Sequence, residues 1–309
     1  MLTKTQVISL LNKYQVSASK ALGQNFLVDP NTLEKIVRLS RISPGDRVIE
    51  VGCGLGSLTL ALLDAHAMVV GIEKDRRLYG ICEQVLSERA LLNSSIATLE
   101  VGKAFLLCAD AMEMSWDDIC GRNQGTVADW SLIANLPYNI ATPLIMNVLE
   151  GAPEIKRMVV LVQKEMADRL CAKSKSSPGP GSYGAVSVKL SYYASARILC
   201  KVSPNVFEPR PNVISALVEI ERFAAPPVEL GEVSVARLYS LIESGYGTRR
   251  KMLRNSLSEI VSEEDFEIAG IDSRLRAEDL SIGDWGVLAQ SVFGHFDPRR
   301  LRDERSTER

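Results

Sequence analysis

The sequence is short of histidine, and its cysteines are not grouped. His66 and His295 are the only two histidines in 309 residues, so a histidine metal centre or a nucleophile–histidine pair has little support. The six cysteines are scattered, and no pair has the two-residue gap that zinc and redox sites use. We therefore expect free thiols in a reducing compartment and no bound metal.

Long apolar runs are also missing. Apolar residues make up 46% of the chain and charged residues 24%, which is ordinary for a globular protein, but no run approaches the length of a membrane span. Residues 1–14 contain two lysines and no continuous apolar stretch, unlike a signal peptide. The sequence thus predicts a cytoplasmic protein without membrane contact.

An excess of positive charge is absent as well. Lysine and arginine number 36 against 38 acidic residues, a net charge of −2, which counts against a nucleic-acid partner. One segment is different, because Arg249, Arg250, Lys251 and Arg254 bring four positive charges together without a nearby acid. We predict that these residues meet nucleic-acid phosphates; a solvated helix face is the alternative.

Short apolar runs alternate with longer helical patterns from residue 47 onward. The runs that predict strands are 47–52, 68–73, 104–110, 131–135 and 158–163. The patterns that predict helices are 57–65, 75–92, 141–150 and 164–173. This alternation predicts an α/β domain with a doubly wound, mainly parallel sheet. Residues 183–194 fit a helix or a strand, and 196–202 and 213–222 predict two late strands that can form an antiparallel edge.

The pattern changes at residues 224–231, where two prolines interrupt it. Beyond this point the periodicity is helical only, at 233–245, 250–261, 263–269 and 282–293. We therefore predict two domains, residues 1–224 and a small helical domain of residues 225–309. Residues 173–182 are rich in Ser, Pro, Gly and Lys and form either a solvated connector or a functional lid.

A glycine-rich turn follows the first predicted strand. Gly52, Gly54 and Gly56 come directly after Glu50 and Val51, and glycines at such a turn let a ligand approach the backbone closely. Sites for NAD and for S-adenosylmethionine both use loops of this kind. The dinucleotide fingerprint needs its third glycine at the position that Ser57 occupies, so the observed spacing favours S-adenosylmethionine.

Two acidic residues end the next two predicted strands. Glu73 lies about 20 residues downstream of the loop, where an acid hydrogen-bonds ribose hydroxyls in this architecture; a solvated carboxylate is the alternative. Asp110 can accept a hydrogen bond from the adenine amine of the cofactor. Its alternative role is to cap the helical turn that follows it.

The tetrapeptide Asn135-Leu136-Pro137-Tyr138 follows the fourth predicted strand. A nucleobase amine is a weak nucleophile, so the protein must position it and accept its hydrogens while a sulfonium cofactor supplies the electrophile. The Asn135 side-chain oxygen and the Leu136 carbonyl can accept these hydrogens, Pro137 stiffens the turn, and Tyr138 can stack on the base. An ordinary proline turn after a strand is the alternative.

A second aromatic residue, Phe207, lies in the segment Phe-Glu-Pro-Arg-Pro at residues 207–211. A target base must leave its stack to reach a methyl donor, and Phe207 is a candidate second wall against which it stacks. A buried aromatic beside two prolines explains the same residue equally well.

Together these motifs resemble the ribosomal RNA adenine dimethyltransferases over residues 18–295. Further matching segments are 21–27, 163–165, 183–184, 215–216 and 249–255. The resemblance implies a Rossmann-like class I methyltransferase sheet with a small all-helical C-terminal domain. It also implies contacts to S-adenosylmethionine at a set of residues that includes the loop glycines, namely Asn25, Leu27, Gly52, Gly54, Gly56, Glu73, Asp110 and Asn135. Tyr138 and Phe207 are then expected to hold the target base.

The activity implied by this resemblance is methylation of N6 of two adjacent adenosines near the 3′ end of 16S ribosomal RNA. The product would be N6,N6-dimethyladenosine, formed late in assembly of the small ribosomal subunit. Three alternatives stay open: methylation of large-subunit RNA, a non-catalytic role in small-subunit assembly, and methylation of DNA adenine or a protein glutamine. The basic segment at 249–255 argues against the first and third.

The low net charge also bears on the form of the substrate. Because it predicts weak binding to naked RNA, we expect the assembled small subunit to be the substrate. Two departures from the family pattern concern affinity: Cys53 stands at a common proline position, and Asn212 replaces a usual lysine. No extended apolar stripe is left over, so we expect a monomer.

Overall fold

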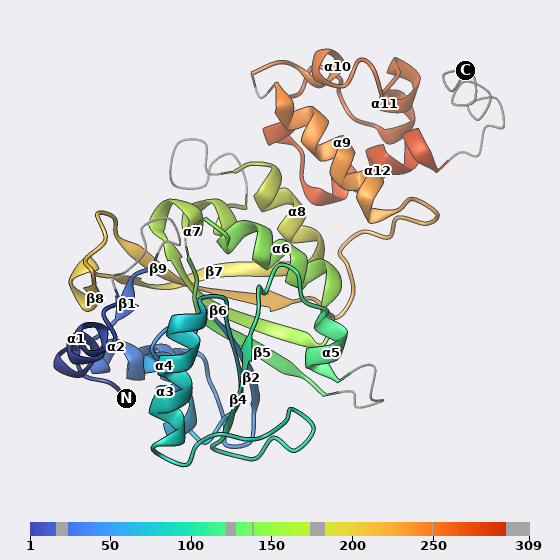
Figure 1. Ribbon diagram of the computed structural model, residues 1–309. Helices are drawn as coiled ribbons and strands as arrows, with labels where there is room; N and C mark the ends of the chain where they lie inside the picture. Colours follow the sequence, from blue (N-terminus) through green and yellow to red (C-terminus); the bar gives the residue numbers. More distant parts are fainter. Residues whose placement is uncertain (17–23, 122–127, 138, 174–182, 249, 295–309) are drawn as a thin grey trace, which may run out of the picture. The chain divides into compact units, whose positions relative to one another are not determined.

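The computed structural model describes residues 1–16, 24–121, 128–137, 139–173, 183–248 and 250–294. It divides into two compact units (Figure 1). The first contains Met1–Cys171 and Ala194–Arg222, and the second contains Ala172–Tyr193 and Phe223–Arg309. The second unit begins close to the boundary expected at residue 224, but it also includes residues 172–193, which the sequence had assigned to the first domain.

A seven-stranded sheet forms the centre of the first unit, in the order β4-β3-β2-β5-β6-β9-β7. The strands are β2 (Arg47–Val51), β3 (Met68–Glu73), β4 (Ala104–Cys108), β5 (Trp130–Asn135), β6 (Ile155–Gln163), β7 (Ala194–Val202) and β9 (Ser215–Arg222). The five strands from β4 to β6 are parallel. β9 runs antiparallel to both β6 and β7, which confirms the antiparallel edge predicted for the late strands.

The helices that connect the parallel strands lie on both faces of this sheet. α3 (Ser57–Asp64) and α4 (Arg76–Ser87) carry the chain outward from β2, whereas α6 (Ala141–Gly151) joins β5 to β6. Because such crossovers are right-handed, the reversal of direction between β2 and β5 places α6 on the face opposite α3 and α4 (Figure 1). A crevice opens beyond the carboxyl ends of the strands at such a reversal.

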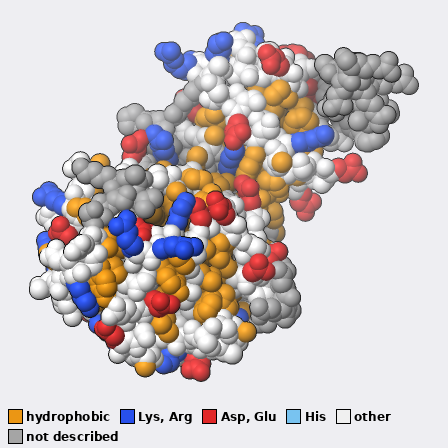
Figure 2. Space-filling model, viewed as in Figure 1, with side chains coloured by type: hydrophobic (Ala, Val, Ile, Leu, Met, Phe, Trp, Pro, Cys, Tyr) orange, Lys and Arg blue, Asp and Glu red, His pale blue; other side chains and the backbone are white. Residues whose placement is uncertain are grey.

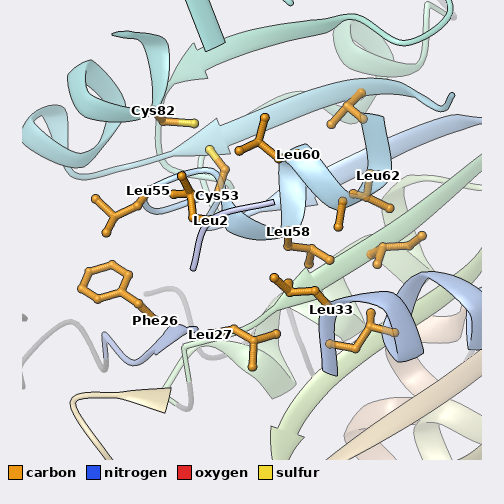
Figure 3. Close-up of a cluster of buried hydrophobic side chains, with 14 of the residues drawn as sticks. Leu2, Phe26, Leu27, Leu33, Cys53, Leu55, Leu58, Leu60, Leu62 and Cys82 are labelled. Atoms are coloured by element: carbon orange, nitrogen blue, oxygen red, sulfur yellow. The ribbon is translucent and has the colours of Figure 1, made fainter. Parts of the chain in front are cut away.

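Helix α3 is apolar on nearly all sides because other elements cover it on two opposite sides. Seven of its eight residues are buried, and it packs against β3 and against α2 (Pro30–Leu39). Figure 3 shows Leu58 of α3 on the side of Leu33 of α2, with Leu27 nearby, whereas Leu60 points to the opposite side of the helix. The glycine-rich loop therefore runs into a helix that is fixed in the core.

A second, two-stranded sheet pairs segments that are far apart in the sequence. β1 (Phe26–Leu27) runs antiparallel to β8 (Phe207–Glu208). The other elements of this unit are α1 (Lys4–Lys13), α5 (Trp116–Cys120), α7 (Lys164–Cys171) and the 3₁₀ turn Pro204–Val206. Neither the small sheet nor α1 and α2 were expected from the sequence, because their apolar patterns are short.

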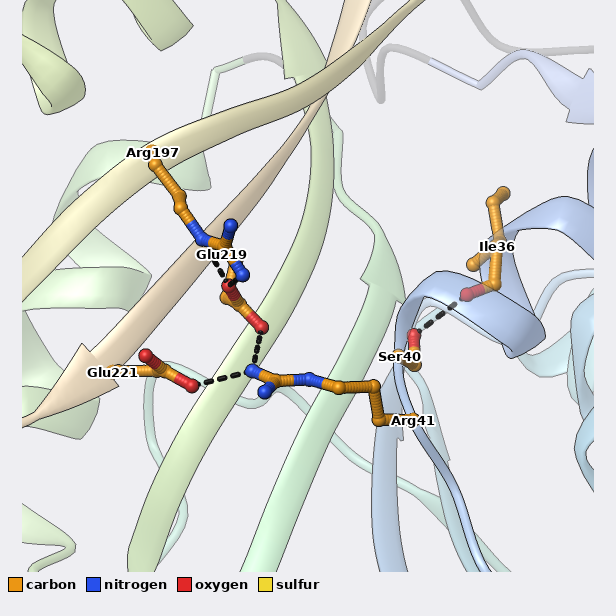
Figure 4. A network of polar contacts seen from close by, with 6 residues as sticks. All are labelled: Ile36, Ser40, Arg41, Arg197, Glu219 and Glu221. Carbon is orange, nitrogen blue, oxygen red and sulfur yellow. Dashed lines mark hydrogen bonds and ion pairs between the residues drawn. The ribbon is translucent and has the colours of Figure 1, made fainter.

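A buried carboxylate joins the late strands to the end of α2 (Figure 4). Glu219 of β9 is 1% exposed and accepts hydrogen bonds from Arg41 and Arg197. Burial by itself would raise the pKa of Glu219, but the two guanidinium groups outweigh burial and hold the pKa below its usual range. Arg41 also pairs with Glu221, so the network ties three elements together.

Arg222, the last residue of β9, binds the end of α6. Its guanidinium donates to the carbonyl oxygens of Val148, Leu149, Ala152 and Ile155 at 2.8–3.1 Å. Hydrogen bonds from a charged donor are among the stronger ones, and carbonyls at a helix end lack partners within the helix. We predict that Arg222→Ala lowers the free energy of unfolding by about 3 kcal/mol, measured by urea denaturation.

The control for this prediction is Arg38→Ala, which removes an exposed arginine from the last turn of α2. That change is expected to alter stability by no more than about 0.5 kcal/mol. Equal effects of the two substitutions would show that the four carbonyl contacts of Arg222 contribute little.

Among the described residues, the regular elements of the second unit are all helices. Its helices are α8 (Ala185–Tyr193), α9 (Val235–Gly247), α10 (Leu253–Ser256), α11 (Glu263–Ala269) and α12 (Ile282–Phe293), with a 3₁₀ turn at Ala277–Asp279. Gly245 of α9 faces Trp285 of α12 so closely that a Cβ on it would lie 2.4 Å from the ring. Residues 183–194, left open by the sequence, are therefore mainly helix.

One predicted helix is much shorter than expected. The pattern at 250–261 predicted a helix, but α10 covers only Leu253–Ser256. The backbone N–H groups of Leu253 and Arg254 bond to the carbonyls of Leu275 and Ser273, so the helix does not begin before Leu253. Among the described residues, no helix is both long enough and apolar enough to span a membrane.

Candidate functional site

A cavity lies at the carboxyl ends of β2, β3 and β5, where the strand order reverses. Four segments line it: the glycine-rich loop, the ends of β3 and β4, the turn after β5, and residues 24–27 around β1. All four belong to the first unit. The cavity therefore gathers most of the residues that the sequence had singled out for a cofactor.

The glycine-rich loop has a left-handed backbone at each of its three glycines. The φ angles of Gly52, Gly54 and Gly56 are 75°, 56° and 85°, which residues with a side chain adopt only under strain. A Cβ on Gly54 would lie 3.4 Å from the ring of Phe26. Gly52 and Gly54 line the cavity, whereas Gly56 does not and instead precedes the first turn of α3.

Glu73 connects this loop to the end of β3. Its Oε2 accepts the N–H of Gly54 and its Oε1 accepts the N–H of Asp75, both at 2.9 Å. Burial raises the pKa of the Glu73 carboxyl, although these backbone donors oppose the shift. The carboxylate lines the cavity, and each of its oxygens keeps a further lone pair for a ligand.

Glu50 is a second buried acid in the wall of the cavity. It is 2% exposed and accepts a hydrogen bond from Thr59 Oγ1 at 2.6 Å. Burial raises the pKa of Glu50 to about 8. At neutral pH this carboxyl is therefore mainly protonated in the protein without ligand, while Glu73 lies close enough to disfavour its ionisation further.

This shift predicts that stability depends on pH through Glu50. In the unfolded chain the carboxyl ionises near 4.5, and in the folded protein near 8, so the folded state binds more protons and stability falls as pH rises between these values. Glu50→Gln removes this ionisable carboxyl and with it the loss of stability at high pH. We expect its melting temperature to exceed that of the native protein by several degrees at pH 9, with the difference vanishing near pH 4.5.

Thermal melts of both proteins at a series of pH values, without cofactor, provide the measurement. Glu73 is present in both, so the difference isolates Glu50. A difference that stayed constant from pH 5 to pH 9 would mean that Glu50 is ionised throughout.

Asp110 follows β4 at the edge of the cavity. Its Oδ2 pairs with Lys74 Nζ at 2.5 Å, and its Oδ1 accepts the N–H of Met112 at 3.0 Å. Lys74, together with that N–H, lowers the pKa of Asp110. Both uses suggested by the sequence are therefore compatible with its position, because Asp110 caps the following turn and also lines the cavity.

The turn after β5 places an amide side chain in the cavity wall. Asn135 Nδ2 donates to the carbonyl oxygen of Asn25 at 2.9 Å, which leaves Oδ1 as the acceptor end of the amide. The N–H of Leu136 bonds to Leu161 of the neighbouring strand, so the turn is fixed to the sheet. Leu136 and Pro137 line the cavity as well; Tyr138 lies outside the described residues.

The other predicted residues that the structure describes are not all among those that line the cavity. Leu27 lines the cavity, but its β-sheet partner Phe207 is 2% exposed, packs in the main core and is absent from the described lining. The position of Phe207 thus matches the alternative of a buried aromatic. Arg250, Lys251 and Arg254 are exposed in the second unit, and Arg249 lies outside the described residues.

Several residues of the cavity were not predicted as site residues. Those with polar or aromatic side chains include Gln24, Phe26, Glu50, Lys74, Asp75 and Asn139. Gln24 and Phe26 lie in the matching segment 21–27, and the others lie within four positions of a predicted residue. Among the described residues, no group of three His, Cys, Asp or Glu side chains could hold a metal ion, and the six cysteines are free thiols.

Comparison with known proteins identifies the family to which a chain with this cavity is similar. The family described as ribosomal RNA adenine dimethylase matches residues 16–292. Proteins named ribosomal RNA small subunit methyltransferase A are similar over most of their length. The one from Bifidobacterium longum subsp. infantis is 37% identical over 90% of this chain and 89% of its own. The one from Alkaliphilus oremlandii is 35% identical over 92% and 94%.

Solved structures share the fold at lower identity. The 23S rRNA methyltransferase ErmE matches with a TM-score of 0.61 at 23% identity, covering 87% of this chain and 99% of its own. A dimethyladenosine transferase from Plasmodium falciparum matches with a TM-score of 0.68 at 21% identity, covering 85% and 95%. The predicted architecture is therefore confirmed as a Rossmann-like class I methyltransferase sheet accompanied by a small helical unit.

Proposed function

Because the chain belongs to the ribosomal RNA adenine dimethylase family, we propose that it methylates N6 of two adjacent adenosines near the 3′ end of 16S ribosomal RNA. The product is N6,N6-dimethyladenosine, made in late assembly of the small ribosomal subunit. The observation that carries the proposal is the Asn135 amide. One hydrogen of its Nδ2 group is donated to the Asn25 carbonyl, which orients the amide and leaves Oδ1 available to accept a hydrogen bond.

The cavity fits S-adenosylmethionine by the chemistry of its walls. Glu73 offers acceptor oxygens for ribose hydroxyls, and Gly52 and Gly54 allow a ligand to approach the backbone. Asp110 carries an acceptor for an adenine amine, and the first turn of α3 favours a carboxylate. Bound there, S-adenosylmethionine supplies an electrophilic methyl group.

The residues of the β5 turn act on the adenine. The oxygen of Asn135 accepts a hydrogen bond from the N6 amine and thereby directs the lone pair of that amine toward the methyl group, and Leu136 contributes its carbonyl as a second acceptor. The proton that N6 loses on methylation leaves to solvent. Positioning of this kind reduces the barrier by up to about 7–11 kcal/mol in favourable intramolecular reactions. Tyr138 is proposed to stack on the base, and the buried Phe207 is proposed to support the site through its β-sheet partner Leu27, which lines the cavity.

The substrate proposed is the assembled small subunit, and the enzyme is proposed to act as a monomer in the cytoplasm, where ribosomes assemble. In Figure 2, Lys and Arg side chains are interspersed with Asp and Glu on the visible face, and the net charge is −2. Such a surface attracts naked RNA weakly. Equal methylation of protein-free 16S RNA would contradict this choice of substrate.

The exposed cations of the second unit supply phosphate contacts. Among the described residues, Arg250, Lys251 and Arg254 form no ion pair within 4 Å. We predict that replacing all three by glutamine weakens subunit binding at least tenfold near physiological salt. It should also reduce the slope of log affinity against log salt by about 2–3. The matched control replaces Arg76, Arg77 and Arg89 by glutamine, which should leave the slope within about 1 of the native value.

The test of the activity uses the purified chain, S-adenosylmethionine and small subunits from cells that lack this modification. Digestion and mass spectrometry would measure N6,N6-dimethyladenosine, with large subunits and DNA as parallel substrates. Product from small subunits alone is expected. Product from large subunits or DNA instead would contradict the proposed substrate. Absence of product from all three substrates would favour the alternative of a non-catalytic assembly factor.

A further inference from the structure

The loop between β8 and β9, residues 209–214, is fastened to both sides of the cavity. At one end β8 pairs with β1, whose residues Phe26 and Leu27 line the cavity. At the other end Ser215 begins β9 opposite Gln163, at the carboxyl end of β6 and one strand away from β5. The loop therefore stands at the same edge of the sheet as the Asn135 turn.

The loop presents apolar side chains to solvent. Val213 and Ile214 are 42% and 49% exposed, and among the described residues they are the only adjacent pair of large exposed hydrophobic side chains. Their backbone is fixed, because the carbonyl of Ile214 accepts the N–H of Lys164 at 2.9 Å and Pro211 is buried. Since both residues are β-branched, their side chains are also stiff.

A cation accompanies this pair. Arg210 is exposed, and among the described residues it forms no ion pair within 4 Å. A guanidinium next to rigid apolar side chains suits a nucleic-acid strand, in which phosphates alternate with stacked bases. Proteins that unstack bases commonly insert apolar side chains between base steps.

We infer that Val213 and Ile214 form an apolar wedge that stacks on the RNA base next to the target adenosine while Arg210 holds the adjoining phosphate. The inference rests on the proposed function. β9 lies two strands from β5, or about 10 Å, which is within reach of a nucleotide that flanks an adenosine turned into the cavity. The wedge thus meets the neighbouring base whose face the target adenosine leaves uncovered when it enters the cavity.

The first experiment compares the full-length chain with Val213→Ala/Ile214→Ala. Single-turnover methylation of unmodified small subunits at saturating S-adenosylmethionine is expected to slow about tenfold, the scale of one lost base-stacking contact. The cofactor Kd, measured by calorimetry, should stay within about twofold because neither side chain lines the cavity. Val101→Ala is the matched control: Val101 is 54% exposed and precedes β4 at the opposite edge of the sheet.

Two further variants separate the wedge from a structural role. Ile214→Phe keeps an apolar stacking surface and should retain the native rate to within about twofold. Arg210→Gln should raise the subunit concentration for half-maximal rate by about threefold or more and lower the salt slope by about 1. The rate at saturation should not change.

Native methylation rates in the double variant would overturn the inference. So would a loss restricted to subunits with unchanged methylation of protein-free 16S RNA, because the loop would then contact a ribosomal protein. Failure of the native chain to methylate any RNA would overturn the proposed function, and the wedge with it.

Discussion

Asn135→Ala is expected to lower the rate of methyl transfer by about 100-fold or more, the size found when one preorganised hydrogen-bonding group is removed from an active site. The variant loses the oxygen that accepts the amine hydrogen, and it loses the bond from Nδ2 to the Asn25 carbonyl. The measurement is single-turnover dimethyladenosine formation on unmodified small subunits. The Kd for S-adenosylmethionine should rise much less than the rate falls.

Two variants sharpen the interpretation of Asn135. Asn135→Asp keeps an acceptor but cannot donate to Asn25, so its rate should fall between the alanine variant and the native chain. Asn139→Ala removes an exposed amide from the same cavity wall and should change the rate by less than about tenfold. If the Asn139 and Asn135 alanine variants were equally slow, the proposed role of Asn135 as amine acceptor would fail.

Glu73→Ala is expected to weaken binding of S-adenosylmethionine by about 100-fold. The carboxylate organises the loop through the N–H groups of Gly54 and Asp75, and its removal leaves two donors without their partner. Each such buried group costs about 1–3 kcal/mol. The same substitution should therefore reduce the free energy of unfolding by about 2 kcal/mol in the absence of ligand.

Titration calorimetry and urea denaturation measure the two effects of Glu73 separately. Glu73→Gln retains one acceptor oxygen and should bind more tightly than the alanine variant, yet more weakly than the native chain. Glu100→Gln, a neutralised acid at an exposed position, serves as the control with unchanged affinity. If Glu73→Ala bound S-adenosylmethionine with the affinity of the native chain, the proposed role of Glu73 in cofactor binding would be wrong.

Sequence periodicity predicted the central sheet well because its parallel strands are buried on both faces. Runs such as Val-Val-Gly-Ile at residues 69–72 are apolar throughout, which is the pattern that a covered strand requires. The pattern failed where short segments depend on distant partners. β1 and β8 have two residues each and pair across 180 positions, and α10 begins only at Leu253, because the N–H groups of Leu253 and Arg254 bond to residues 273–275.

The alternating fold, the glycine loop, Glu73 and the Asn135 turn can be predicted from local spacing after buried strands. Which of these residues come into contact depends on the packing of the whole first unit. It brought Asn25 to Asn135, buried Glu50 beside Thr59, and placed Phe207 in the core. Burial and pairing between distant segments depend on how the elements pack, and local periodicity does not encode that packing.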